Sequence, residues 1–239
     1  MNRTILFAVL ASACVFRTDM TIEHSDVEIG TVVDDILLDI HAGTVTVVVG
    51  DVDKAQVNRI LRYGHNPPDV DVYTVGATLV VEARCPSLAG QCSADHEIVL
   101  PKSASFEGYT GSGDVNVMGL TDDVKVETGS GDVQLDEIEG LISVETGSGD
   151  VVGRDLLTSS ILIETGSGDV DLHIDAQPND VFVNTGSGDV YTELPEGAYR
   201  VKTSTGSGDV SVDGIFSDSS APDHIEIGTG SGDIKIRGI

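Results

Sequence analysis

Hydrophobic and polar residues alternate in short stretches along most of this 239-residue chain. In the stretch after Thr128, Val133 and Leu135 form one alternating pair, and Ile142 and Val144 form the next. A spacing of two residues is typical of a β-strand that buries one face. Because two such pairs recur in each period, the pattern predicts coils that contain two short strands and stack on one another.

The periods are marked by seven copies of the hexapeptide Thr-Gly-Ser-Gly-Asp-Val/Ile. Successive copies are 18, 18, 19, 20, 20 and 24 residues apart, and they begin at Thr110, Thr128, Thr146, Thr165, Thr185, Thr205 and Thr229. The frequent Gly-Ser-Gly-Asp segments exclude helices between the copies. The expected fold is therefore all-β, a parallel, β-helix-like β-solenoid of about 18–24-residue coils.

The hexapeptide is predicted to be the corner of each coil. Val124 and Val126 occupy even-numbered positions, whereas Val133 and Leu135 occupy odd-numbered positions. The side of the chain that faces the core must therefore change between these two pairs. Glycine suits such a bend because it adopts positive φ without strain. The predicted structural corner residues are Gly111, Gly113, Asp114, Gly129, Gly131, Asp132, Gly147, Gly149, Asp150, Gly166, Gly168, Asp169, Gly186, Gly188, Asp189, Gly206, Gly208, Asp209, Gly230, Gly232 and Asp233.

The aspartates of the seven copies are expected to form a column on the outer edge of the corners. Coils lie roughly 4.8 Å apart, so neighbouring carboxylates repel unless hydrogen bonds or cations offset the charge. Backbone N–H donors in the corner are the favoured partners. A column of divalent cations is the alternative, although Gly and Asp are adjacent here, unlike in the calcium-binding Gly-Gly-x-Gly-x-Asp repeats.

Residues 27–101 lack the hexapeptide but keep the alternation of strands. Strands are expected at 36–40, 43–50, 70–73, 78–83 and 97–101, with a loop at 65–68. We interpret this region as degenerate coils of the same sheets that cap the N-terminal end of the solenoid formed by residues 102–239.

The first residues are typical of an export signal. Arg3 precedes a short apolar stretch, and the ending Leu-Ala-Ser-Ala-Cys resembles a bacterial lipobox with Ala11 where Leu is usual. We expect a lipoprotein signal peptide at residues 1–13, lipidation of Cys14, and a tether at residues 14–26. Ordinary cleavage that leaves Cys14 as a thiol is the alternative. Cys85 and Cys92 then form a disulfide, as suits an exported protein.

Three features together resemble the bacterial DUF4097 family, whose members are provisionally labelled adhesins. They are the strand Gly43-Thr44-Val45-Thr46-Val47, the segment Ile98-Val99-Leu100-Pro101, and the Ser-Gly-Asp-Val motifs from Ser112 to Ile234. The resemblance covers roughly residues 30–239 and implies a β-solenoid. It brings no catalytic residues to this sequence.

Composition narrows the function further. The net charge of −27 disfavours nucleic acid as a partner. Aromatic residues make up 4% of the chain, which does not suit a deep aromatic pocket. No nucleophile elbow, phosphate-binding loop or metal-ligand spacing occurs, so we expect no catalytic residue, cofactor or metal.

The sequence therefore predicts a non-enzymatic protein of the bacterial cell envelope. Its lipid anchor would hold it at the outer membrane or cell surface, where the acidic solenoid would serve adhesion or contact with an unidentified protein or surface ligand. A divalent-cation-binding module and a carbohydrate-active β-helix enzyme are the alternatives. The last strand is expected to form an exposed terminal rung, which invites end-to-end self-association, and Lys235 and Arg237 on this strand are expected to discourage it.

Overall fold

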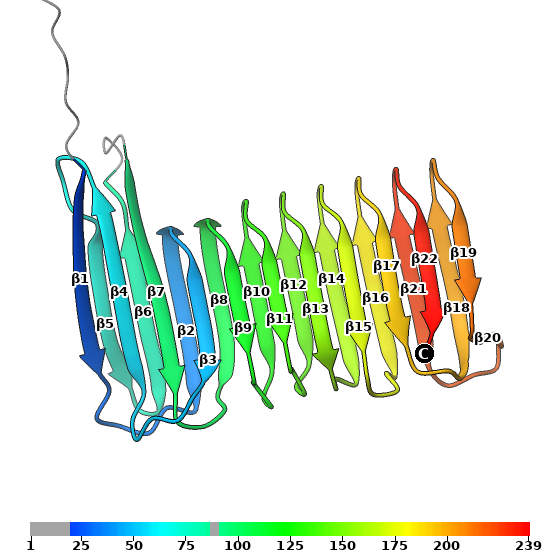
Figure 1. Ribbon diagram of the computed structural model, residues 1–239, viewed down its shortest axis with the longest axis horizontal. Coiled ribbons are helices and arrows are strands. Elements are labelled where there is room, and N and C mark those ends of the chain that lie inside the picture. The colour runs from blue at the N-terminus through cyan, green and yellow to red at the C-terminus, as the bar shows by residue number, and fades with distance from the viewer. Residues whose placement is uncertain (1–19, 87–90) are drawn as a thin grey trace, which may run out of the picture.

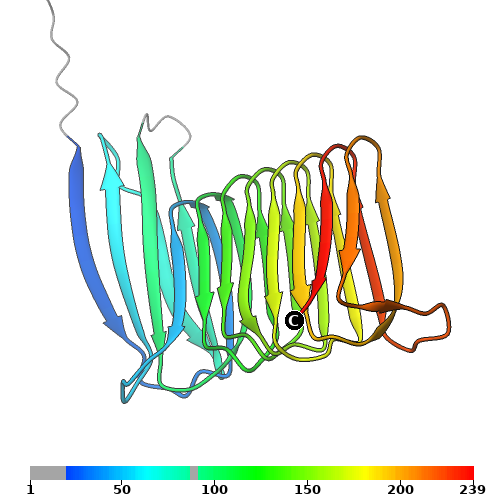
Figure 2. The ribbon, with the colours of Figure 1, turned by 45° about the vertical axis from the view of Figure 1, so that its right-hand side comes forward.

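The computed structural model describes residues 20–86 and 91–239, which form 22 strands and no helix. The strands lie in two sheets of 11 strands each. The two sheets face each other along the whole length of an elongated molecule (Figures 1 and 2). The predicted all-β solenoid is confirmed. Within the described residues, no helix is long and apolar enough to cross a membrane.

In the repeat region, each coil gives one strand to each sheet, and like strands pair in parallel. The strands of this region are β8 (Ser105–Ser112), β9 (Val115–Met118), β10 (Val124–Thr128), β11 (Val133–Asp136), β12 (Ile142–Thr146), β13 (Val151–Leu156), β14 (Ser160–Thr165), β15 (Val170–Ile174), β16 (Asp180–Thr185), β17 (Val190–Leu194), β18 (Ala198–Thr205), β19 (Val210–Asp213), β20 (Phe216–Ser217), β21 (His224–Thr229) and β22 (Ile234–Gly238).

The core between the sheets consists of the alternating apolar residues. Val133 and Leu135 of β11 face Ile142 and Val144 of the next coil's first strand, and all four side chains are buried. Their polar neighbours along each strand point to solvent, as a period of two requires. Each coil thus repeats the same small aliphatic layer, which accounts for the near absence of aromatic residues from the core.

The N-terminal region joins both sheets, but it is only partly made of coils. Its strands are β1 (Thr21–Glu28), β2 (Asp35–Ala42), β3 (Val45–Val49), β4 (Gln56–Tyr63), β5 (Asp69–Val75), β6 (Thr78–Arg84) and β7 (Cys92–Leu100). β2 and β3 form a regular coil beside β8 and β9. β4 pairs antiparallel with β1 and β7, and β5 pairs antiparallel with β6. The prediction of degenerate coils alone is therefore wrong, since hairpin-like pairs complete this end.

The predicted tether is also partly wrong. Residues 21–26 belong to β1, which pairs with β4 along its whole length. β1 and β4 were missed because their inward and outward positions both carry polar residues, so no alternation marks them.

The last two coils do not follow the order of the sequence. β22 lies between β17 and β19, and β21 lies between β16 and β18. In Figure 1 the red strands β21 and β22 accordingly stand between the yellow and the orange ones. The prediction that Lys235 and Arg237 lie on the terminal rung is wrong, because β22 has a neighbour on each side. The terminal rung consists of β18 and β19.

Candidate functional site

The corner of each coil is held by backbone contacts between glycines. The second glycine of all seven copies has φ between +138° and +159°. A Cβ atom on Gly188 would lie 2.0 Å from the carbonyl oxygen of Gly168, so no larger residue fits. The first glycine has no positive φ, but a Cβ atom on Gly129 would lie 2.6 Å from the carbonyl oxygen of Gly111.

The aspartates form a hydrogen-bonded column at these corners. The backbone N–H of Asp150 donates to Oδ1 of Asp132 at 2.9 Å, and the same bond links each neighbouring pair at 2.7–3.1 Å. Along the stack the order is Asp114, Asp132, Asp150, Asp169, Asp189, Asp233 and Asp209. One oxygen of each carboxylate except that of Asp209 is thus engaged by the next coil.

The threonine that starts each hexapeptide has a role that sequence reasoning missed. Its side chain points inward at the corner and is buried in six of the seven copies. The hydroxyl of Thr185 donates to the carbonyl oxygen of Gly168 at 3.1 Å, and that of Thr229 donates to Gly188 at 3.0 Å. The hydroxyls of Thr110 and Thr128 have no hydrogen-bond partner in the described chain. Thr185 continues the alternation of Val181 and Val183, so spacing places its side chain inward, but the sequence does not show which carbonyl oxygen its hydroxyl contacts.

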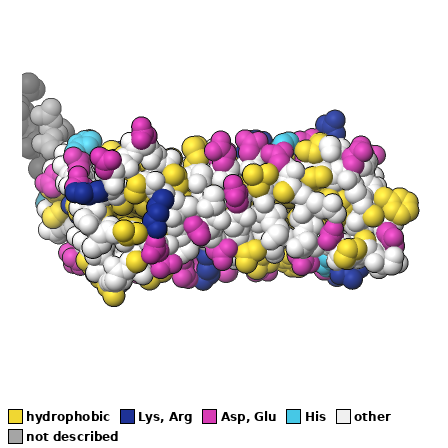
Figure 3. All heavy atoms as spheres, turned by 90° about the horizontal axis from the view of Figure 1, so that it is seen from below, with side chains coloured by type: hydrophobic (Ala, Val, Ile, Leu, Met, Phe, Trp, Pro, Cys, Tyr) yellow, Lys and Arg dark blue, Asp and Glu magenta, His cyan; other side chains and the backbone are white. Residues whose placement is uncertain are grey.

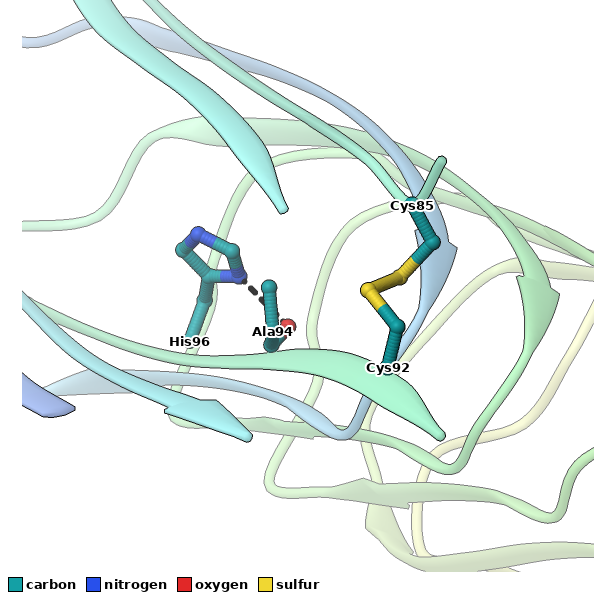
Figure 4. The surroundings of a disulfide bond; sticks show 4 residues. All are labelled: Cys85, Cys92, Ala94 and His96. Carbon is teal, nitrogen blue, oxygen red and sulfur yellow. Dashed lines mark hydrogen bonds between the residues drawn. A yellow bond between two sulfur atoms is a disulfide. The ribbon is translucent and has the colours of Figure 1, made fainter. Parts of the chain in front are cut away.

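The disulfide between Cys85 and Cys92 is confirmed, with a Cα–Cα distance of 5.8 Å. It closes the connection between β6 and β7 (Figure 4). Close by, the buried His96 places Nδ1 3.0 Å from the carbonyl oxygen of Ala94. Burial lowers the pKa of His96 to about 4, and Nε2 has no partner in the described chain. Cys14 and the predicted signal peptide lie outside the described residues.

A groove crosses the outer face of the second sheet at the N-terminal end of the solenoid. It has a volume of about 670 Å³ and spans β5, β6, β2, β8 and β10. The pairing register places Leu37 beside Val80, and Val80 beside Tyr73. Leu37 and Val80 thus form an apolar floor whose outward position comes from the alternation of β2 and β6.

Two exposed tyrosines stand at opposite sides of this floor. Tyr73 of β5 is 45% exposed and Tyr109 of β8 is 50% exposed. β5 and β8 are three strand positions apart in the sheet, which corresponds to roughly 14 Å. The rings therefore bracket the floor without touching each other, and they leave room for a ligand between them.

The groove is acidic. Asp39, Glu82, Glu107 and Glu127 line it, with Lys125 as the one cationic residue among its lining. The Lys125 ammonium lies 2.9 Å from both Glu107 and Glu127. The hydrogen bonds that the ammonium donates to these carboxylates raise the pKa of Lys125, so it remains charged and already paired. The lining then has a net charge of −3, and one of its carboxylates, Asp39, is also paired with Arg84 at 3.1 Å.

Such a groove can bind a cationic group that is attached to an apolar or planar body. The ring faces of tyrosines attract cations, and unpaired carboxylates accept hydrogen bonds from them. Sequence analysis missed this site because its tyrosines come from separate strands that only the register brings together. The signal was weak, since each tyrosine occupies an ordinary outward strand position.

A second cluster lies on the outer face of the first sheet. Donor atoms of Asp155, His173 and Asp175 lie within 4.8 Å of one another. His173 Nε2 is also 3.9 Å from Glu193. The register of β13 and β15 shifts between Gly153 and Leu156, and Asp155 within this irregularity has φ +51°. The irregularity brings Asp155 to His173 although the sequence spacing gave no sign of a metal site.

Comparisons with known proteins agree with the fold. The model of the family described as Toastrack DUF4097 matches residues 97–237. A comparison with curated proteins finds no match.

Two solved structures extend the likeness over nearly the whole chain. A provisionally named adhesin from Bacteroides fragilis is 16% identical, with a TM-score of 0.51 over 90% of this chain and 97% of the other. A provisionally named lipid-binding protein from Parabacteroides distasonis is 12% identical, with a TM-score of 0.50 over 91% of this chain and 96% of the other. At such identities the likeness shows a shared fold.

Proposed function

This chain belongs to the Toastrack DUF4097 family, and we propose that it is a non-enzymatic, lipid-anchored protein of the bacterial cell envelope that contacts partners through its acidic groove. The observation that carries the proposal is the groove between Tyr73 and Tyr109, with an apolar floor and an excess of carboxylates.

The proposed ligand is cationic. The groove lining has a net charge of −3, and Glu82 is its one carboxylate without an ion-pair partner among the described residues. The chain as a whole carries −27, which attracts cations over long range. The same charge repels anionic lipid headgroups, so a lipid ligand like the one implied by the name of the Parabacteroides neighbour is disfavoured. The adhesin name of the Bacteroides neighbour supports a role in surface contact.

The groove is tested by calorimetry with four defined probes: tetralysine, tetraglutamate, a chitosan tetramer and cellotetraose. We expect tetralysine and the cationic chitosan tetramer to bind, with affinity that falls as salt rises. Tyr109→Ala should weaken the binding of tetralysine by about fivefold, the size of a single cation–π contact. Tyr191→Ala on the outer face of the first sheet is the matched control and should change nothing. No binding of either cationic probe, or preference for cellotetraose, would contradict the proposed ligand class.

The anchor is tested separately, at Cys14. Radiolabelled palmitate should be incorporated into the native chain and not into Cys14→Ser. The substituted chain should also leave the membrane fraction. If Cys14→Ser stays in the membrane fraction, the anchor is wrong, while the groove can still be correct.

Cation binding is the second candidate function, and the Asp155, His173 and Asp175 cluster favours it. One imidazole with carboxylates suits Mn²⁺, Ni²⁺ or Zn²⁺ better than Ca²⁺, which prefers oxygen ligands alone. Zn²⁺ titration should raise the melting temperature of the native chain but not that of His173→Gln. His224→Gln is the control, because His224 also lies 3.8 Å from Asp180 and 3.9 Å from Glu226. An equal response of all three chains would contradict this site.

A further inference from the structure

The C-terminal end of the solenoid exposes side chains that are core residues everywhere else. Val210 and Val212 of β19 pair with Ile234 and Ile236 of β22. Ile234 and Ile236 are 1% and 0% exposed, whereas Val210 and Val212 are 44% and 38% exposed. The side chains of β19 therefore point inward as those of β22 do. Val210 and Val212 are more exposed because no coil in the described chain packs beyond β18 and β19.

Backbone groups of this rung are also left without partners. In an inner coil, the N–H of Gly188 donates to Ser231 and that of Val190 donates to Asp233 in the next coil. The equivalent N–H groups of Gly208 and Val210 have no acceptor in the described residues. Edge strands of this kind are templates for pairing with another chain.

The end is only partly covered. β20 pairs with β18 at Ala198 and Tyr199 alone, which leaves β18 open from Arg200 onward. Phe216 of β20 is itself 68% exposed. Figure 3 shows hydrophobic atoms protruding at this end of the molecule, where β18, β19 and β20 lie.

The N-terminal end is protected by contrast. Its two edge strands are charged, and charged edge strands resist pairing: β1 carries Glu23, Asp26 and Glu28, and β5 carries Asp69 and Asp71. A head-to-tail contact would place β19, with Asp213 and the preceding Asp209, against the acidic β1. A second copy that meets the first through the same C-terminal end avoids that repulsion.

We propose that two copies of this chain join end to end through β18 and β19, around a two-fold axis parallel to the strands. Such an axis places β19 of one copy antiparallel to β18 of the other in both sheets. Lys202 precedes Thr205 by three residues, and Asp213 follows Val210 by three, so both lie at the same height below the corner. Both side chains point outward, and each Lys202 then faces the partner's Asp213.

The contact closes on itself because the same surface serves both copies. It covers Val210 and Val212 with their counterparts and extends each sheet across the junction. Lys202 is held by Glu226 within its own chain, so its ammonium stays near this position. The proposal is independent of the groove, which lies at the other end of the molecule (Figure 1).

The test is light scattering after size-exclusion chromatography of the full chain carrying Cys14→Ser, which removes lipid and the third thiol. We expect a species of twice 24.9 kDa. Val212→Lys should convert it to monomer, with circular dichroism to verify folding, while Ile22→Lys on β1 should leave the dimer intact. A monomer at every concentration would overturn the proposal, and so would open-ended oligomers that Ile22→Lys also disrupts.

A charge exchange tests the two-fold geometry with exposed residues alone. Asp213→Lys should raise the dimer dissociation constant about tenfold, and so should Lys202→Asp, because each places like charges opposite each other. The double variant should return the constant to within about threefold of the native value, since it restores opposite charges. Additive weakening in the double variant would show that these residues do not face each other and would overturn the assigned geometry.

Discussion

The repeat region and the N-terminal region build the same pair of sheets by different means. In the repeat region the coils are joined at the corners by backbone groups, as where a Cβ atom on Gly188 would meet the carbonyl of Gly168. In the N-terminal region, β4 and β7 run antiparallel, and individual side chains hold them. Arg62 pairs with Asp95 there, and a disulfide closes the connection from β6.

The difference shows what repetition requires. Identical corners stack at the same close spacing in every coil. They therefore depend on glycine, which has no Cβ atom to clash with the neighbouring coil. An end that occurs once can use a specific ion pair, a disulfide and a buried imidazole. We therefore expect the repeat region to respond to changes at its glycines, and the N-terminal region to respond to pH and redox conditions.

The largest expected effect is at a repeat corner. Gly188→Ala should lower the free energy of unfolding by about 4 kcal/mol or more, because it combines an unfavourable φ of +145° with a backbone clash. Gly64→Ala in the N-terminal region is the control, since nothing lies within 4 Å of its added Cβ. Urea unfolding measures both. Equal stability of the two variants would show that the corners are not packed as described.

The next effect is the pH response of His96. Its pKa is about 4 in the folded chain and near 6.5 when unfolded, so the unfolded chain binds the proton first as pH falls. The neutral imidazole's contribution is complete above pH 6.5 and is lost progressively toward pH 4, by about 3 kcal/mol. Arg59 lowers this pKa further, and Asp95 partly opposes it.

Comparison of His96→Leu with the native chain isolates this response. The stability of His96→Leu should fall less between pH 7 and pH 4 in urea unfolding, by about 3 kcal/mol. Thr128→Val in the repeat region removes another buried atom without a partner, but no titratable group. It should shift stability equally at both pH values. A parallel pH profile for His96→Leu would exclude the imidazole as the source.

The repeat region was predictable because each coil carries its own period and corner. Seven copies fixed the parallel stacking, and the change of parity around Gly129 and Gly131 located the bend. The order of the coils along the sequence predicts their order in space for all but the last two coils, which are exchanged. Local patterns do not distinguish a coil that adds to the end from one that inserts beside Thr185, since both bury the same face.

The N-terminal region and the groove were less predictable for a related reason. β4 pairs with β1 on one side and with β7 on the other. Because this pairing stabilises β1 and β4, their residues need not alternate between apolar and polar. The groove depends on which strands become neighbours, and β2 lies between β6 and β8 although β6 follows β2 in sequence. The disulfide was predictable because its cysteines are close in sequence.

Removal of this disulfide should have a smaller effect. Cys85→Ser with Cys92→Ser should cost about 2.5 kcal/mol, as expected for a loop with a sequence separation of 7. The loss should concentrate at the N-terminal region, so hydrogen exchange should quicken in β4 and β7 and stay unchanged in β12 and β14. Uniform acceleration would instead mean that the two regions unfold as one unit and that their contrast does not extend to stability.

The smallest effect concerns the charge of the aspartate column. Asp150 accepts a hydrogen bond from the backbone of Asp169 at 2.8 Å, and the amide oxygen of Asp150→Asn can accept the same bond. The substitution removes one of seven charges stacked roughly 4.8 Å apart. Asp150→Asn should therefore be slightly more stable than the native chain at low salt, with a difference that shrinks as salt rises.

Asp150→Ala separates the hydrogen bond from the charge. It removes both, so it should be less stable than Asp150→Asn at every salt concentration, as measured by thermal unfolding. If alanine and asparagine behave alike, the column's side-chain hydrogen bonds do not contribute to stacking. The corners would then be held by glycine packing and backbone hydrogen bonds alone, and the aspartates would serve to keep the outer edge charged against association with other chains.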